Sequence, residues 1–426
     1  MKKFIKILTI IVFIFNSNES TANTLIDSLS SAYKNNPQLN AKRAKTRASK
    51  EEKRGAVSEF LPSVTISGYL SDQNNKNPGS DSNFQPSEQS LIIEQKIFQG
   101  FEGVANFKKK NYQFNIAEFK LKKIEQEVLL TAAKAHMHLL LNKKKLKINL
   151  MNVDLLERQV ETDQNRLEKG DISLTDLAQS ESSLSGAVAK LITAKNDLLT
   201  SKANFEKIIG KKASENIKEI EITDFNLPKS LAAAQKIAKV ENPDLQIALM
   251  EYKQSKLDVV IAGSELSPSA TLSYKIAEQD DLSSTIQDRT QETVTATATW
   301  PLFSGGKNIF NLRKTKENRN EKELLLEGSK KTNETNVINA WSIYQSSKSI
   351  LESIESQVKA AEIANEGITV EYESGNDRTT LEVIQSRTIL LNSRLDLASA
   401  EINFFTSQFN LLSSTGRLTA KQLNLK

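Results

Sequence analysis

The residues of this chain that could do chemistry are few, and their spacing argues against an active site. The 426 residues include two histidines, His136 and His138, and no cysteine. On a helix, residues i and i+2 point to different faces, so packing or solvent exposure accounts for these imidazoles better than a shared metal ion. The sequence has no Walker-type phosphate loop and no His-Glu-x-x-His motif. We therefore expect neither an enzyme nor a bound metal or cofactor.

The N-terminus predicts export from the cytoplasm. Two lysines precede an apolar run at residues 4–15, and small residues follow at 20–22. This order is typical of a cleaved signal peptide, here residues 1–22, because a run of about twelve residues is too short to cross a bilayer as a helix. Its removal lowers the net charge from +5 to +3. So small a charge argues against nucleic-acid binding, and the lack of cysteine excludes disulfides and a lipid attached to cysteine.

The chain is written as two similar halves. Matching features at an offset of 205 or 206 residues are Asn36-Pro37 and Asn242-Pro243, Pro62-Ser63 and Pro268-Ser269, Phe98-x-Gly100 and Phe303-x-Gly305, and Gly170 and Gly375. Heptad stripes at 177–205 and 383–411 repeat as well, and small residues beside them let two helix backbones approach closely. We predict tandem repeats at 23–210 and 237–416, a linker at 211–236 and a tail at 417–426.

Proline placement indicates where the longest helices run. No proline lies between residues 87 and 227 or after residue 301. Nothing therefore stops a helix over 101–169 or over 305–373, and at 1.5 Å per residue each would be roughly 100 Å long. Each then reaches a glycine turn and returns as a second coiled-coil helix. The prediction is one long helical hairpin per half, at 101–209 and 305–415.

Each half also carries two segments with the alternation of a β-strand. The predicted strands cover about 63–71, 89–98, 269–277 and 292–302. In the last of them Val294, Ala296, Ala298 and Trp300 fall on one face and threonines on the other. The segments between paired strands are long, polar and rich in turn-forming residues, so we expect them to form the tips of two hairpins.

Strands of about ten residues with one apolar face are the elements of a transmembrane barrel, although a half-buried soluble sheet has the same pattern. Phe98, Phe101, Trp300 and Phe303 stand at the strand ends, where aromatic side chains would lie at the membrane interface. An open sheet edge in lipid leaves backbone groups unpaired at a cost of several kcal/mol each. Since at least eight strands are needed for closure, we expect three chains to supply twelve.

This order of elements resembles the TolC-like outer-membrane efflux proteins over about residues 23–416. The most specific stretches are RLEKGDISLTDLAQSE and EYESGNDRTTLEVIQSR, which are similar to the two periplasmic tips of that family. The resemblance implies a mainly α fold with a β-barrel contribution, in a homotrimer with a barrel in the outer membrane and a helical tunnel in the periplasm. It implies a passive exit duct of a tripartite efflux pump or type I secretion system. The implied partners are a periplasmic adaptor and an inner-membrane transporter of the ABC, RND or MFS type.

The resemblance assigns the closed gate to four tip residues, Thr175, Asp176, Tyr372 and Arg378. An exposed ion pair between Asp176 and Arg378 of neighbouring hairpins would contribute about 0 to 1 kcal/mol. In a trimer three such contacts add up, and together they can favour the closed state by a free energy small enough for a docking partner to reverse. The alternative is that both are ordinary solvated charges and that Tyr372 continues a heptad stripe. Relative to the family, an extra residue lies between Gly375 and Arg378, which alters the expected pairing.

The resemblance also places an entrance constriction at Glu382. In a trimer this residue would form a ring of three carboxylates that favours cations and raises the local pKa values. The alternative is a solvated glutamate on a helix face. One turn further on, where the family often has a second acidic residue, this chain has Gln385. The turns at Gly170 and Gly375 are where an adaptor would dock.

Two other classes of protein share part of this pattern. A periplasmic adaptor also contains a long helical hairpin, but usually one hairpin inserted into β-rich domains, without duplication of the whole chain. An exported coiled-coil scaffold would lack the four alternating strands. The sequence therefore favours an outer-membrane channel over both.

Overall fold

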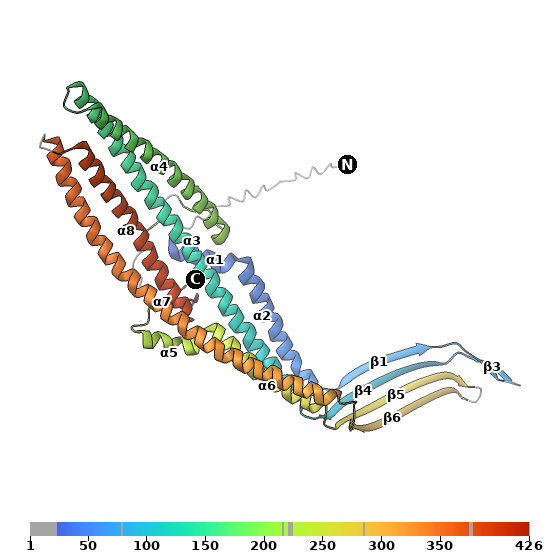
Figure 1. The fold of residues 1–426 in the computed structure, drawn as a ribbon. Helices are drawn as coiled ribbons and strands as arrows, with labels where there is room; N and C mark the ends of the chain where they lie inside the picture. Colours follow the sequence, from blue (N-terminus) through green and yellow to red (C-terminus); the bar gives the residue numbers. More distant parts are fainter. Residues whose placement is uncertain are drawn as a thin grey trace, which may run out of the picture.

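The molecule is elongated, with long helices forming the body and a sheet projecting at an angle from one end (Figure 1). The computed structural model describes residues 24–77, 80–214, 217–219, 225–283, 286–374 and 378–425. Outside these ranges lie the predicted signal peptide, residues 1–22, and Gly375 of the second expected turn. Among the helices within them, none combines the length and apolar character that a membrane crossing requires.

The helices repeat in the two halves. Those of the first half are α1 (Leu25–Asn35), α2 (Pro37–Gly55), the 3-10 turn η1 (Ala56–Phe60), α3 (Glu102–Glu168) and α4 (Leu174–Ile209). Those of the second are α5 (Leu231–Glu241), α6 (Pro243–Ser264), α7 (Lys307–Glu373) and α8 (Thr380–Ser414). Asn36 and Asn242 cap the helices that follow them, with proline at the first helical position. The helices α3 and α7 have 67 residues each, a length of about 100 Å.

Four helices lie side by side at each level of the body. Near the tip the order is α4, α3, α8, α7, and near the sheet it is α2, α3, α6, α7 (Figure 1). The helices α3 and α7 run through both levels and join them. The helix α3 therefore has neighbours on both sides throughout, whereas α7 lies at the edge of the row at both levels and packs against α5 around Val337 and Ala340.

The main core lies in the middle of the body, where α1, α3, α4, α8 and the C-terminal segment meet. Leu129, Met137, Phe205 and Phe409 are buried there almost completely. The tail packs into the same core through Leu418, and the backbone N–H of Ala420 donates to Glu125 Oε1 at 2.7 Å. Burial of these large side chains fixes the middle of the molecule.

The sheet has the strand order β1, β4, β5, β6, and every neighbouring pair is antiparallel. Its strands are β1 (Ser63–Leu70), β4 (Ser87–Gln99), β5 (Ser269–Ser283) and β6 (Ile286–Thr299). Beyond β1 and β4, the tip expected in the first half contains a further hairpin, in which β2 (Gln73–Asn77) pairs with β3 (Ser80–Phe84). The last strand ends at Thr299 rather than near 302, and Pro301 could not have donated to the ladder.

One face of the sheet is apolar across all four strands. Val64 pairs with Ile93, Ile93 with Tyr274, and Tyr274 with Val294, so the four side chains form one row. A bulge in β4 between Lys96 and Phe98 brings Phe98 opposite Ala270, which belongs to the same face. Without this bulge Phe98 would share the polar face with Lys96. Ile66 on this face is 82% exposed, so the apolar face lacks a cover within the chain.

Candidate functional site

The turn of the first hairpin and the start of both returning helices are specified locally by the sequence. Gly170 adopts φ +79°, and its N–H donates to the carbonyl of Leu167 at 3.0 Å, which closes the end of α3. The returning helices α4 and α8 each begin with a capping box, formed by Ser173 with Asp176 and by Thr379 with Glu382. Caps of this kind fix where each helix restarts, so the tip has a defined shape.

The structure does not join Asp176 and Arg378 within one chain. Asp176 Oδ2 accepts from the Ser173 N–H at 3.0 Å and from Ser173 Oγ at 2.7 Å, and these hydrogen bonds lower the pKa of the Asp176 carboxyl. Arg378 binds Glu371, with Nε to Oε2 at 2.6 Å, and Glu382, with Nη1 to Oε1 at 3.0 Å. Any contact between Asp176 and Arg378 would have to form between two chains.

Within the chain, Glu382 belongs to the cap of α8. Its Oε2 accepts from the Thr379 N–H at 2.8 Å. This backbone hydrogen bond, followed by the contact with Arg378, lowers the pKa of Glu382 within the chain rather than raising it. Thr175 and Gln385 are exposed, and neither makes a side-chain hydrogen bond to the described part of the chain. Of the tip residues expected from the sequence, Tyr372 alone is buried.

Tyr372 belongs to a buried polar cluster that joins the two hairpins. Its Oη donates to Asp163 Oδ1 at 3.0 Å and lies 3.0 Å from Thr380 Oγ1. Asp163 is completely buried on α3 and also accepts from Gln159 Nε2 at 2.8 Å and from Ser180 Oγ. A buried carboxylate is tolerated only when hydrogen bonds replace its water. Three donors do so here, and Tyr372 is the one supplied by the second hairpin. We call this Asp163–Tyr372–Thr380 contact the tip latch.

Two arginines surround the tip latch. The Arg166 guanidinium lies 4.4 Å from the centre of the Tyr372 ring. Burial lowers the pKa of Arg387 on α8, and its Nη1 has no hydrogen-bond partner among the described residues. Burial also raises the pKa of Tyr372, so the phenol keeps the proton that it donates to Asp163.

Sequence reasoning missed Asp163, although a signal was present. Leu156 lies seven residues earlier and is buried in the cluster that packs α3 against α4. Asp163 therefore occupies a heptad position that faces a neighbouring helix, where a lone charge is unusual. Such a charge indicates a buried partner, but the partner is 209 residues away in the chain.

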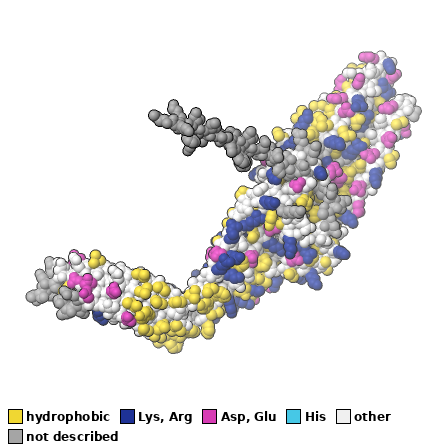
Figure 2. All heavy atoms as spheres, turned by 180° about the vertical axis from the view of Figure 1, so that it is seen from behind, with side chains coloured by type: hydrophobic (Ala, Val, Ile, Leu, Met, Phe, Trp, Pro, Cys, Tyr) yellow, Lys and Arg dark blue, Asp and Glu magenta, His cyan; other side chains and the backbone are white. Residues whose placement is uncertain are grey.

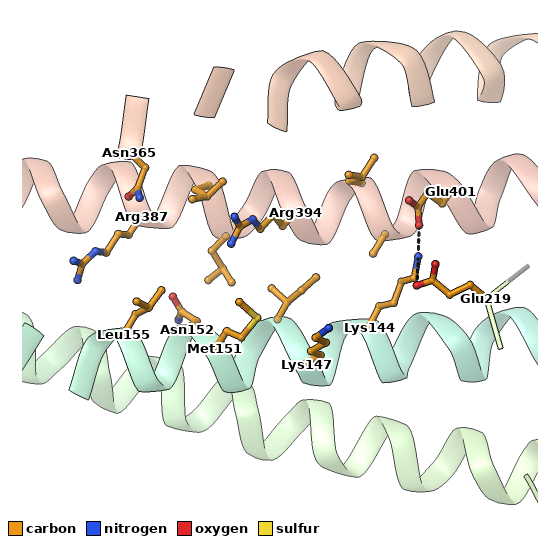
Figure 3. A pocket seen from close by; sticks show the side chains of 15 residues that line it. Lys144, Lys147, Met151, Asn152, Leu155, Glu219, Asn365, Arg387, Arg394 and Glu401 are labelled. Carbon is orange, nitrogen blue, oxygen red and sulfur yellow. Dashed lines mark hydrogen bonds and ion pairs between the residues drawn. The ribbon is translucent and has the colours of Figure 1, made fainter. Parts of the chain in front are cut away.

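Below the tip latch, the seam between the hairpins opens into a groove of about 370 Å³ between α3 and α8 (Figure 3). Met151 and Leu155 line its α3 side. Lys144 closes the end nearer the core, with Nζ 2.6 Å from Glu401 and 3.5 Å from Glu219. Side chains thus bridge the two hairpins at both ends of the groove. The contact of Lys144 with Glu401 is the bridge near the core, and the tip latch is the bridge farther from it.

The two histidines have separate environments. His136 is buried in the core, with Nδ1 2.9 Å from Ser28 Oγ and its ring centre 6.0 Å from that of Phe205. Burial lowers its pKa from 6.5 to about 4, so the imidazole is neutral. His138 is exposed. No group of three metal-ligating side chains occurs in the described ranges.

The aromatic residues expected at the membrane interface gather where the sheet meets the helices. Phe98 and Phe101 pack edge to face with ring centres 5.7 Å apart, and Trp300 Nε1 donates to the carbonyl of Leu266 at 3.2 Å. Trp300 and Phe303 are nevertheless 62% and 87% exposed. Figure 2 shows hydrophobic side chains concentrated over this bend. We call this surface the apolar belt; it also includes Val57, Phe60, Leu61 and Leu302.

Comparison with known proteins gives one consistent result. The model of the family described as outer membrane efflux protein matches residues 28–211 and 235–417. The outer membrane efflux protein BepC of Brucella suis biovar 1 (strain 1330) is 25% identical over 414 residues, which cover 97% of this chain and 90% of BepC. The outer membrane protein TolC of Escherichia coli K12 is 22% identical over 450 residues, covering 99% and 88%.

Solved structures agree on the fold. The outer membrane protein VceC of Vibrio cholerae superposes with a TM-score of 0.80 at 16% identity, over 92% of this chain and 96% of that one. The CmeC outer membrane channel of Campylobacter jejuni gives 0.81 at 15% identity, over 93% and 86%. The TolC-like fold expected from the sequence is confirmed.

Proposed function

The chain belongs to the outer membrane efflux protein family, and from that membership we propose how it forms and closes a channel. It is an efflux channel of the outer membrane, and its helices lie in the periplasm. The family is one of channels rather than enzymes, and the adaptor considered above is not favoured. The working form that we propose is a homotrimer, in which three sheets close into a twelve-stranded barrel.

The open sheet is the observation that carries this proposal. Among the described residues, β1 pairs only with β4 and β6 only with β5, so each chain offers two free strand edges. Its apolar face is also uncovered. Lipid can cover that face, but it cannot supply hydrogen bonds to the edges. A neighbouring copy supplies these hydrogen bonds when its β1 pairs with β6, and lipid covers the apolar face of the closed barrel.

The helical edges support the same assembly. The helices α4 and α7 form the two edges of the body at the tip level. Ile192 and Leu199 on α4 and Ile350 and Ile363 on α7 are more than half exposed. In a closed ring, α7 of one chain would lie beside α4 of the next and remove apolar surface of this kind from water.

We place the gate at the periplasmic tip. In each chain the tip latch holds the second hairpin to the first, and Asp176 could meet Arg378 across the chain boundary. Opening needs Tyr372 to leave Asp163, which would expose a carboxylate that is now buried. Water can take over the lost hydrogen bond once the hairpins separate, so the change is reversible. Glu382 and Gln385 would line the entrance.

The remaining partners follow from the passive nature of the channel. A periplasmic adaptor and an inner-membrane transporter would supply the energy and open the tip, with the turns at Gly170 and Gly375 as docking points. Phe98, Phe101, Trp300 and Phe303 would mark the depth of the barrel in the membrane.

Oligomeric mass tests the assembly directly. The mature protein, purified in detergent, should have the mass of three chains by light scattering after subtraction of the bound detergent. A cysteine placed on β1 should cross-link to one on β6 of another chain, whereas a cysteine pair on the polar tips of two chains should not. A folded monomer that stays in water without detergent would overturn the proposal.

A further inference from the structure

One face of α2 carries a stripe of basic side chains. Its members are Arg43, Arg47, Lys50 and Arg54, at spacings of four, three and four residues. Such spacings place side chains on one face of a helix. A different face of α2 packs on α3, because Ser49 is buried and Thr46 Oγ1 lies 3.3 Å from the carbonyl oxygen of Ala117. Within the chain, Arg43 lies 4.3 Å from the centre of the Tyr33 ring and donates to Asn40 Oδ1 at 2.7 Å, whereas the other three members are exposed.

The stripe keeps most of its positive charge. Arg47 and Lys50 are exposed and have no ion pair or hydrogen bond to the side chains that the structure describes. Arg54 pairs with Glu51 at 2.7 Å, which offsets one of the four charges, although both side chains are 64% exposed. The other three members have no acidic partner among the described residues.

The stripe leads directly into the apolar belt. The helix α2 ends at Gly55, and Val57, Phe60 and Leu61 of the belt follow it. At 1.5 Å per residue, Arg54 lies about 5 Å and Lys50 about 10 Å along the axis from the level of Val57. Figure 2 shows the hydrophobic side chains over the bend and a concentration of Lys and Arg side chains over the adjoining part of the body in the same view.

We infer that this stripe binds the anionic headgroups of phospholipids in the leaflet that faces the periplasm. Basic side chains next to a membrane-embedded surface attract anionic lipid, and the attraction falls off within a screening length of about 8 Å at physiological salt. Arg54 and Lys50 should therefore contribute most, and Arg43 least. The contact would set the depth of the barrel and select the lipids around it, a property beyond channel formation.

Lipid selectivity of the assembled protein tests the inference. The mature trimer is placed in phosphatidylcholine vesicles, and electron spin resonance measures the relative association of spin-labelled phosphatidylglycerol and spin-labelled phosphatidylcholine. The wild type should prefer phosphatidylglycerol by at least about threefold. In the variant R47Q/K50Q/R54Q the preference should fall to about one. In 1 M salt, where the screening length is about 3 Å, the wild type should lose it too.

A matched variant removes equal charge elsewhere. K190Q/K195Q/K202Q changes three exposed lysines on α4, away from the belt, and should keep the wild-type preference. The inference is overturned if R47Q/K50Q/R54Q and the wild type select lipids equally. It is also overturned if the stripe variant loses binding to isolated peptidoglycan while lipid preference is unchanged. Conductance recorded on the same preparations shows separately whether channels form.

Discussion

The two ends of the molecule hold together by opposite means. At the sheet end, large apolar side chains such as Ile66 and Phe303 face outward, and the outer strand edges lack partners in the part of the chain that the structure describes. At the tip end, the structure is held by helix caps, ion pairs and the hydrogen bonds of one buried carboxylate. Apolar burial is strong and non-directional, whereas hydrogen bonds can be exchanged with water at small net cost. The difference indicates an end that stays fixed in the membrane and an end that can open.

The largest effect is expected from a charge on the apolar face of the sheet. Ile66→Lys should destabilise the inserted protein by about 2 to 4 kcal/mol per chain, because lysine would face the hydrocarbon. The neighbouring substitution Thr65→Lys puts the same charge on the opposite face and should cost about 1 kcal/mol or less. Urea titration of vesicle-inserted protein, followed by tryptophan fluorescence, measures both. Equal losses would show that the two faces do not differ as described.

The core between the two ends should weaken first on acidification. His136 has a pKa of about 4 in the fold against an ordinary 6.5, so its contribution to stability is complete above pH 6.5 and is lost as the pH falls towards 4. The loss amounts to about 3 kcal/mol per chain. His136→Asn should flatten the dependence of the unfolding midpoint on pH between 6.5 and 4. His138→Asn, at the exposed histidine, should leave the slope unchanged; the same slope in both variants would refute this role.

The tip latch should be weaker than either of these. Tyr372→Phe removes the hydroxyl that joins α7 to Asp163 and should reduce closure by about 2 kcal/mol per chain. Tyr344→Phe provides the control, since Tyr344 lies on the same helix and stacks on Phe404, while its hydroxyl has no hydrogen-bond partner in the described part of the chain. Distance measurements between spin labels on the two tips should broaden in Y372F alone. Broadening in both variants would point to loose packing instead.

The smallest effect concerns the contact proposed between chains. Asp176→Asn keeps the cap of α4 but removes the charge that could meet Arg378, and it should favour opening by about 0 to 1 kcal/mol. Ser173→Ala does the reverse, because it removes a cap partner and leaves the charge. Leakage of a small dye from protein-containing vesicles should rise with D176N and not with S173A. Higher leakage with S173A than with D176N would identify Asp176 as a capping residue without a role in the gate.

The features predicted correctly are those with a local or periodic signature. The Asn-Pro helix starts and the glycine turn at Gly170 need only a few adjacent residues, and the 67-residue helices follow from the absence of proline. Arg378 shows what local reasoning could have added, while its contact with Asp176 of a neighbouring hairpin stays a prediction. Its partners Glu371 and Glu382 lie seven and four residues away, whereas the prediction looked for a distant aspartate.

The features that the sequence did not reveal depend on contacts between distant segments. The bulge that turns Phe98 to the apolar face becomes visible only when β4 is paired with β5. The hairpin of β2 and β3 is polar except for Phe84 at its end, and it lacks the alternation that marks a strand beside a core. Asp163 is a charged residue at a heptad position that faces a neighbouring helix, but the sequence around it does not indicate that Tyr372 is its partner.

Single-channel conductance of the mature trimer in planar bilayers tests the difference between the two ends most directly. The account predicts long-lived channels of low resting conductance, because the barrel is permanent and the tip is closed. Tyr372→Phe should raise the resting conductance severalfold, and Tyr344→Phe should not. Absence of channels, or the same conductance in the wild type and Y372F, would contradict a fixed barrel with a latched tip.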